Sequence, residues 1–263
     1  MPIRVSIISV SFNNGSSIEN FISSVQKNIS PKDELIIVDN HSNDDTALKI
    51  KNFKNVKLIL SDKNLGFSKG NNLGVKSARG QYLFFLNPDT QMEKPILDEL
   101  VSFYEDKDAG LVGPKLIESS GTIQASVRNL PTIWEAFREY ILGIKHKFGQ
   151  YVPAVNHPIE VGAVYGAAML VSKKLFEEIK GFDERYFLYY EDIDLCRKIK
   201  RAGKHVYYFP GVYIKHLVGG SKSSLDRALL NRKSLYIYHG FIEGSILNLI
   251  FLIARLRRKL TLG

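Results

Sequence analysis

Short apolar runs alternate with amphipathic stretches along the first third of the chain. Apolar positions recur at helical spacing from Ile18 to Val25, and a second helix is expected from Thr46 to Phe53. A glycine- and asparagine-rich loop is expected over Asn64–Asn72. The apolar runs themselves, rich in β-branched and aromatic residues, are predicted to be buried strands: Val5–Val10, Leu35–Val38, Val56–Leu60 and Tyr82–Leu86. This alternation predicts an α/β fold with a mostly parallel sheet.

Polar segments follow three of these strands, at the edge of a parallel sheet where ligands bind. They are Ser11–Gly15, Asp39–Asp45 and Asn87–Thr90. Asp39 is placed to accept hydrogen bonds from a base or a ribose. A carboxylate at Asp89 near a diphosphate favours Mg²⁺ or Mn²⁺, although Asn-Pro-Asp is also ordinary turn chemistry.

From Ala109 onward the pattern changes to short strands, short helices and a loop-rich middle near Pro131–Pro158. This second half is expected to be α+β and to pack on the first half, with no linker between them. Strands are predicted at Gly110–Leu116, Val161–Val171 and His205–Phe209, and helices at Ser172–Ile179 and Asp192–Ala202.

An aromatic run leads into a cluster of acids at the start of the second of these helices, over Phe187–Arg197. Asp192 lies on the apolar stripe of that helix, so burial would raise its pKa and make it a better general base. Alternatively, the acids only stabilise the positive end of the helix dipole, with Asp194 and Arg197 as a local pair.

His216 follows the predicted strand Val212–Lys215 and precedes a Gly-Gly-Ser-Lys loop. An imidazole there can ligate a metal or donate to a phosphate, although a lone histidine is more often structural. The loop offers backbone N–H groups and the Lys222 cation to phosphate.

The chain has 263 residues and a formal net charge of +9. This charge predicts attraction to phosphate in a nucleotide, a nucleic acid or an anionic membrane. Its one cysteine, Cys196, excludes an intramolecular disulfide and a cysteine-based metal cage, and is expected in the core. The N-terminus shows no signal-peptide pattern, which predicts a cytoplasmic protein.

Near the C-terminus, the apolar run Ile246–Ala254 is about half as long as the ~20 residues that span a bilayer. A basic cluster containing Arg255 and Arg257 follows it. This combination favours an amphipathic helix lying in the surface of an anionic leaflet. A terminal helix packed on the core, with a solvated tail, is the alternative.

Several other function classes have weaker support. The first turn lacks the closely spaced glycines of a dinucleotide fingerprint, and no P-loop is present. Lysines and arginines are scattered, without a recognition helix or RNA-stacking motif, so no nucleic-acid partner is expected. A basic nucleic-acid-binding protein, a nucleotide-binding scaffold with weak catalysis and a nucleotidyltransferase stay open as alternatives.

A set of short motifs, in order from about Val5 to about Ser221, resembles the family 2 glycosyltransferases and within them the rhamnosyltransferase-type branch. The motifs are Val5–Asn13, Val38–Ser42, Asn64–Phe67 with Gly70–Asn72, Leu86–Thr90, Gly181–Glu184, Tyr190–Leu195 and His216. The resemblance implies a GT-A fold: a Rossmann-like, mostly parallel sheet flanked by helices. Residues 1–115 would form the nucleotide-sugar-binding half, 116–225 the acceptor-binding half and 226–263 a basic helical tail.

The resemblance also implies a function. The enzyme would move a sugar such as rhamnose or another hexose, with inversion, from a dTDP- or UDP-sugar. The acceptor would be a hydroxyl of a lipid-linked or growing cell-surface glycan. A divalent metal, Mn²⁺ or Mg²⁺, would be the cofactor. We expect a peripheral enzyme at the inner face of the cell membrane; the sequence leaves a homodimer open.

Site roles carried over by position give Asp192 as the general base, with Glu191 as a supporting carboxylate. Asp89 and His216 would bind the metal or diphosphate, and Lys222 would stabilise the departing diphosphate. Apart from the carried-over roles, the small Gly166 and Ala167 could let the sugar approach the backbone or could serve tight strand packing, and Tyr190 could stack on the sugar or belong to the core. The nucleotide contacts would be Ser11, Asn13, Asp39, Asn64, Gly66, Asn71 and Asn87. One departure is Asn87, which replaces the first acid of the family's Asp-x-Asp motif and makes metal dependence less certain.

Overall fold

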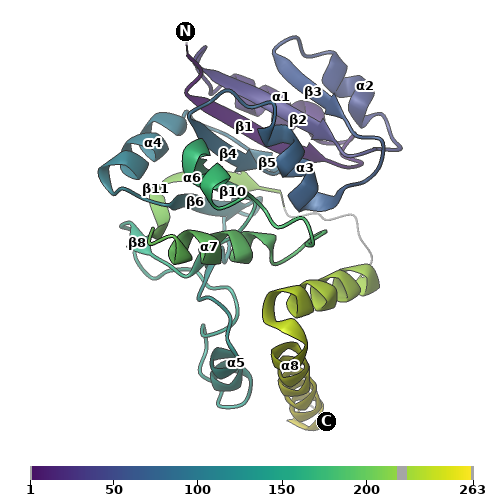
Figure 1. Ribbon diagram of the computed structural model, residues 1–263, viewed down its shortest axis with the longest axis vertical. Coiled ribbons are helices and arrows are strands. Elements are labelled where there is room, and N and C mark those ends of the chain that lie inside the picture. The colour runs from purple at the N-terminus through teal and green to yellow at the C-terminus, as the bar shows by residue number, and fades with distance from the viewer. Residues whose placement is uncertain (1, 218–223, 262–263) are drawn as a thin grey trace.

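A central β-sheet organises the chain, and the computed structural model describes residues 2–217 and 224–261 of it (Figure 1). Within these residues the sheet has nine strands, in the order β3-β2-β1-β4-β10-β6-β11-β5, with β8 paired to β11. The strands of the first half are β1 (Val5–Ser11), β2 (Asp33–Asp39), β3 (Val56–Leu60) and β4 (Tyr82–Leu86). They pair in parallel, as the sequence predicts.

Helix α3 (Gly66–Val75) corrects one prediction, because its first residues were expected to form a loop. Its glycines permit close packing rather than flexibility. A Cβ atom at Gly70 would lie 2.8 Å from Val10, and one at Gly74 would lie 2.6 Å from Ile8. The glycine content that suggests a loop is therefore a requirement of helix-to-sheet contact. The other helices of this half are α1 (Ile18–Gln26), α2 (Thr46–Lys51) and α4 (Leu97–Asp106).

The second half adds strands to the free side of β4. β10 (Ala168–Ser172) lies antiparallel between β4 and β6 (Leu111–Glu118). The single strand expected over Val161–Val171 is divided, since its first part forms β9 (Ala163–Val164), which pairs with β7 (Val127–Arg128) outside the main sheet. The remaining short strands are β5 (Thr90–Gln91) and β8 (Ile159–Glu160).

Strand β11 (Val206–His216) joins the two strands expected around Pro210 into one. It runs parallel to β6, and its register shifts between Phe209 and Tyr213. Its last residue, His216, pairs with Thr90 of β5. The irregular strand therefore carries His216 to the segment that follows β4.

Both faces of the sheet are covered by helices, which explains the continuous apolar runs. Ile8 and Phe85 face one cluster of the core, together with α6 (Lys173–Glu178) and α7 (Glu191–Arg201). The neighbouring residues Ile7 and Phe84 face the other cluster, with α1 and α4. Successive strand residues thus lie in opposite core layers.

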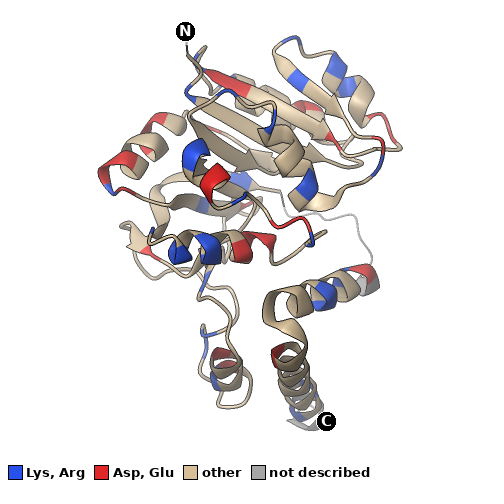
Figure 2. Ribbon diagram, viewed as in Figure 1, with Lys and Arg blue, Asp and Glu red and all other residues tan. Residues whose placement is uncertain are grey.

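Helices α5 (Ile133–Tyr140) and α8 (Ser224–Thr261) project from the end of the molecule away from β1–β3 (Figure 1). Gly240 has φ 75° and ψ 179° and divides α8 into two legs. By length and composition, Asp226–Arg257 is apolar enough to cross a membrane. Lysines and arginines are dispersed over the ribbon rather than gathered on one element (Figure 2).

Candidate active site

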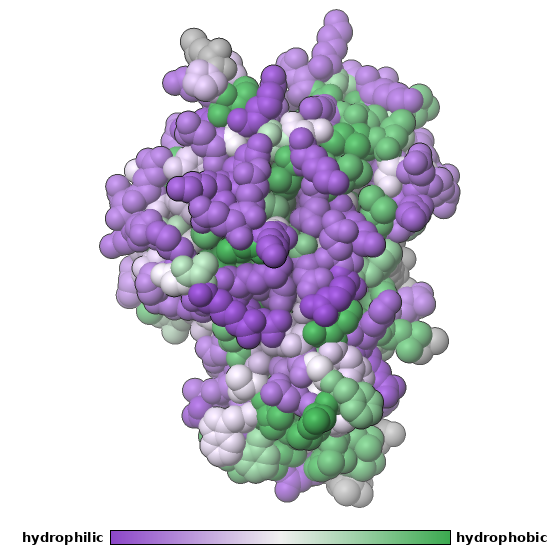
Figure 3. All heavy atoms as spheres, in the orientation of Figure 1, coloured by the Kyte–Doolittle hydropathy of each residue, from purple (hydrophilic) through white to green (hydrophobic). Residues whose placement is uncertain are grey.

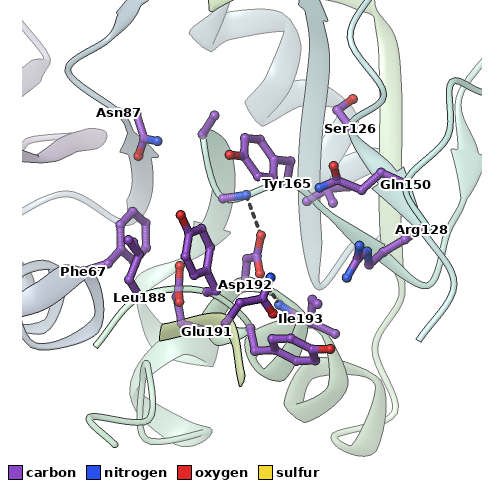
Figure 4. Close-up of a pocket in the computed structure, with 16 residues that line it drawn as sticks. Phe67, Asn87, Ser126, Arg128, Gln150, Tyr165, Leu188, Glu191, Asp192 and Ile193 are labelled. Carbon is purple, nitrogen blue, oxygen red and sulfur yellow. Dashed lines mark hydrogen bonds between the residues drawn. The ribbon is translucent and has the colours of Figure 1, made fainter. Parts of the chain in front are cut away.

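Two adjoining cavities lie at the carboxyl ends of the strands. The first, here the strand-end cavity, measures about 410 Å³ and is lined by the segments after β1, β2 and β4. The second, here the acid cavity, measures about 280 Å³ and contains Glu191 and Asp192 (Figure 4). Both are lined by Asn87, together with Phe67, Leu188 and Tyr189. A ligand can therefore extend from one cavity into the other.

The strand-end cavity gathers most of the predicted nucleotide contacts. Its lining includes Asn13, Asn64, Gly66, Asn87 and Asp89. Asn13 has a left-handed backbone with φ 55°, held by a hydrogen bond from its N–H to Ser42 Oγ (2.9 Å). Asn64 Oδ1 accepts from the N–H of Gly66 (2.9 Å) at the start of α3.

Three other predicted nucleotide contacts lie behind the wall of this cavity. The buried Ser11 hydroxyl donates to Asn14 Oδ1 (3.1 Å), and the buried Asn71 amide donates to Phe67 O (3.0 Å). Because these groups are committed to internal hydrogen bonds, Ser11 and Asn71 support the wall rather than line it. Asp39 is also buried: Oδ2 accepts from Ser42 N (3.1 Å), whereas Oδ1 has no partner in the described chain.

Asp89 lines the strand-end cavity, and His216 lies beside it. His216 Nε2 lies 3.4 Å from Asp89 Oδ1, which is buried and has no hydrogen-bond partner among the described residues. The other ring nitrogen, Nδ1, lies 2.8 Å from Gln124 Oε1. An amide oxygen only accepts, so the neutral tautomer with its proton on Nδ1 satisfies this contact. Nε2 then points an unshared electron pair at a carboxylate oxygen.

Two acceptors opposed in this way fit a bound cation. The donor set of one carboxylate and one imidazole suits Mn²⁺ or Mg²⁺ when phosphate oxygens complete the shell. Gln124 would orient the imidazole, as second-shell partners of metal-bound histidines do. Among the described residues, no group of three or more His, Cys, Asp or Glu side chains could hold a metal by itself. A metal bound here would therefore need oxygen atoms of the ligand to complete its coordination.

The acid cavity is built on a strained turn before α7. Tyr189 and Tyr190 both have left-handed backbones, with φ 71° and 69°. Such conformations cost non-glycine residues of order 1–3 kcal/mol each, and they cluster at functional sites. Here they bring Glu191 and Asp192 into the cavity at the first residues of the helix.

Asp192 is held by backbone N–H groups. Its Oδ2 accepts from Gly166 N (2.9 Å), shown by a dashed line in Figure 4, and its Oδ1 accepts from Ile193 N (2.8 Å). Burial raises the pKa of Asp192, while nearby Arg128 and these N–H groups act in the opposite direction. The carboxylate is therefore poorly solvated but fixed in orientation.

Glu191 has a different environment although it is adjacent. Burial raises the pKa of Glu191 well above its ordinary range, and the neighbouring Asp192 raises it further. Its Oε2 has no hydrogen-bond partner in the described residues. Because Asp192 receives the N–H groups and the arginine charge, the negative charge of the pair belongs mainly on Asp192.

The remaining predicted sugar contacts surround this pair. Gly166, Ala167 and Tyr190 all line the acid cavity. A Cβ atom at Gly166 would lie 3.3 Å from the Asp192 Cβ, so its small size serves the approach of Asp192. Ala167 O accepts from Asn87 N (2.9 Å), which ties the two cavities together. Lys222 lies outside the described residues.

Some residues of the two cavities had no signal in the sequence. Arg128 and Asn231 line the acid cavity, Arg227 lines the strand-end cavity, and Gln124 holds His216. They come from β7, from α8 and from the segment before β7. Two structural predictions are confirmed: Cys196 is buried, and the acids at the start of α7 include an ion pair between Asp194 and Arg197.

Comparisons with known proteins identify the family of this chain. The family model described as Glycosyl transferase family 2 matches residues 6–180. The chain is 26% identical to an N-acetylglucosaminyl-diphospho-decaprenol L-rhamnosyltransferase of Mycobacterium tuberculosis, over 88% of the chain and 82% of the relative. It is 30% identical to rhamnosyltransferase WbbL of Escherichia coli, over 75% of the chain and 79% of the relative.

Solved structures show the same fold. Staphylococcus aureus TarS in complex with UDP superposes with a TM-score of 0.61 at 17% identity, covering 89% of this chain and 64% of TarS. GalNAc-T7 with UDP, GalNAc and Mn²⁺ has a TM-score of 0.64 at 18% identity, covering 88% of this chain and 46% of that protein. The predicted GT-A architecture is thereby confirmed.

Proposed function

This chain belongs to glycosyl transferase family 2, and from that premise we propose that it transfers rhamnose or another hexose from a nucleoside-diphosphate sugar, with inversion. Membership in the family confirms the expected enzyme class. The observation that carries the finer proposal is the junction of the two cavities at Asn87, with Asp89 and His216 on one side and Asp192 on the other.

In the proposed reaction, the nucleotide lies in the strand-end cavity and the sugar reaches past Asn87 toward the acid cavity. Asp192 takes the proton of the acceptor hydroxyl while that oxygen attacks the anomeric carbon. The attack comes from the face opposite the leaving diphosphate and inverts the configuration. Burial of Asp192 favours this role, because a raised pKa makes the carboxylate a stronger base.

Within the strand-end cavity, Asp89 and His216 would hold a divalent metal, with Mn²⁺ and Mg²⁺ as the candidates. When bound, the metal stabilises charge on the departing diphosphate. Gln124 fixes the His216 ring for this purpose. Asn87 has an amide where the family's motif has an acid, which leaves Asp89 as the carboxylate ligand from this turn.

The activities for which the relatives are named support a donor and an acceptor. Two relatives are rhamnosyltransferases, and one is named for a diphospho-decaprenol-linked N-acetylglucosamine. We therefore place a dTDP- or UDP-sugar in the strand-end cavity, with dTDP-rhamnose tested first. The proposed acceptor is a hydroxyl of a lipid-linked or growing glycan at the inner face of the cell membrane.

A donor screen tests the proposal. The full chain is incubated with dTDP-rhamnose, UDP-glucose and UDP-N-acetylglucosamine in the presence of Mn²⁺, and release of the nucleoside diphosphate is measured. One donor should be consumed preferentially, and when a lipid-linked glycan acceptor is added, NMR of the glycoside product should show an inverted anomeric centre. A retained configuration would refute the mechanism. Tight nucleotide binding without turnover would instead support the catalytically weak scaffold.

A further inference from the structure

A third cavity connects the acid cavity to the projecting end of the molecule. It measures about 370 Å³ and lies between α5, the segment after it, and both legs of α8. We refer to it as the amphipathic cavity. Arg128, Tyr190 and Asn231 line both it and the acid cavity. A molecule held near Asp192 can thus continue into this space.

One wall of the amphipathic cavity is aromatic. Tyr140, Phe148 and Phe251 are in mutual contact, with ring centroids 5.2 to 5.9 Å apart. Leu235 and Ala254 extend this wall. Such a surface favours a hydrocarbon chain over a sugar.

The same cavity contains two arginines and no acidic residue. Arg128 lies at its inner end, where Figure 4 shows the guanidinium on the side that faces Asp192. The Arg128 Nε is buried and has no hydrogen-bond partner in the described chain. Arg255 lines the cavity from the second leg of α8 and is exposed. Guanidinium groups bind phosphate through several parallel hydrogen bonds, so this pair favours a phosphate group.

The outer end of the cavity adjoins an exposed apolar surface. The stretch of α8 that contributes Phe251, Ala254 and Arg255 also exposes Leu249, Leu252 and Leu256, each by more than half of its surface. In Figure 3, hydrophobic residues gather at this end of the molecule. A hydrocarbon chain leaving the cavity would meet this surface rather than water.

We infer that the amphipathic cavity binds the phosphate groups and first isoprenoid units of a lipid-linked acceptor. This inference rests on the proposed function and specifies how its acceptor is held. The sugar of the acceptor lies beside Asp192, its diphosphate lies between Arg128 and Arg255, and its chain leaves along α8. The cavity would then select acceptors that carry both a phosphate and a hydrocarbon.

Binding of farnesyl diphosphate tests the inference, measured by calorimetry on the full chain with saturating UDP and Mn²⁺. UDP fills the strand-end cavity, so diphosphate binding there cannot contribute. Farnesyl diphosphate should bind under these conditions, and inorganic diphosphate and farnesol should each bind at least tenfold more weakly. Arg255→Gln should weaken farnesyl diphosphate binding about tenfold, and Arg255→Lys by less. Displacement of farnesyl diphosphate by UDP, or equal binding to Arg255→Gln, would overturn the inference.

Two controls separate a specific site from general attraction and from failure of the enzyme. Lys145→Gln removes one charge from the exposed segment after α5 and outside the cavity, and should leave binding unchanged. Donor hydrolysis without acceptor is measured in parallel. If no sugar nucleotide is consumed, the proposed function fails. If a donor is consumed but farnesyl diphosphate does not bind, only the inference fails. A dimer whose interface excludes farnesyl diphosphate, seen by light scattering, would also overturn it.

Discussion

The strand-end cavity and the acid cavity are built in different ways. The first is lined largely by segments that directly follow parallel strands, so Asn13, Asn87 and Asp89 are placed by the sheet itself. The second is assembled from β7, the segment between β9 and β10, a strained turn with the start of α7, and α8. The difference suggests that donor binding depends on the sheet, whereas turnover depends on long-range packing. Substitutions in the two cavities should therefore have separable effects.

Asp192→Asn is expected to have the largest effect, a loss of turnover without a loss of donor affinity. Loss of a general base typically lowers turnover about 10² to 10⁴-fold, and the transfer rate should fall by this amount. The affinity for UDP with Mn²⁺, measured by calorimetry, should be unchanged because Asp192 does not line the strand-end cavity. Asp106→Asn, at an exposed carboxyl of α4, is the control and should transfer at the normal rate. A normal transfer rate for Asp192→Asn would show that the acid cavity does not supply the general base.

Asp89→Asn is expected to weaken the binding of metal and nucleotide, which Asp192→Asn should leave unchanged. It removes the carboxylate that faces His216, and the affinity for Mn²⁺ and UDP together should fall about 10- to 100-fold. Binding of UDP without metal should change little. Asn87→Asp, which supplies a second acid at the same turn, should instead tighten Mn²⁺ binding. If both variants bound Mn²⁺ and UDP as the natural chain does, the metal assignment would be wrong.

Gly66→Ala should affect both cavities, because Gly66 is in contact with the turn before α7. It has φ 76°, and an added Cβ would overlap Phe187 O and the Phe187 ring. Strain and overlap together should lower the free energy of unfolding by about 3 kcal/mol. Gly121 has φ 84° but open space around it, so Gly121→Ala isolates the strain and should cost about 1 kcal/mol. Equal losses in urea unfolding would show that the Phe187 contact is unimportant.

The smallest effect is expected from Glu191→Gln, and it depends on pH. The raised pKa of Glu191 means that the folded chain holds this proton over a range where the unfolded chain has lost it. Its contribution to stability is therefore present at low pH and is lost as the pH rises through the folded pKa. At pH 8 the glutamine variant should be more stable by about 1 kcal/mol, because its side chain is neutral without taking up a proton when the chain folds. The advantage should vanish near pH 4. Melting temperatures across this range measure the difference, and a constant offset would contradict it.

Much of the donor side was predictable from local pattern. The runs Leu35–Val38 and Tyr82–Leu86 are apolar at every position, since helices cover both faces of the sheet. Once the strands are known, the segments at their carboxyl ends must meet at one edge. The helix over Gly66–Val75 was missed because its glycine content is typical of a loop. Glycine is needed there because the helix packs closely against Ile8 and Val10 of β1.

The acid cavity was predictable only in part. The position of Asp192 on the inward stripe of α7 follows from helical spacing, and its burial confirms this. Its hydrogen bond from Gly166 and the proximity of Arg128 do not follow, because these contacts join segments far apart in the chain. The pairing of His216 with Thr90, which faces His216 toward Asp89, likewise requires the β11–β5 register.

The sequence by itself determined the alternation of strands and helices in the first half, apart from α3, and the family whose motifs these are. Each of these depends on features of short segments: the spacing of apolar residues and the residue types that form turns. Tertiary structure decided which remote side chains meet: His216 with Asp89, Arg128 with Asp192, and α5 with α8. Such contacts depend on strand register and helix packing, which are set by the free energy of the whole core rather than by any one segment.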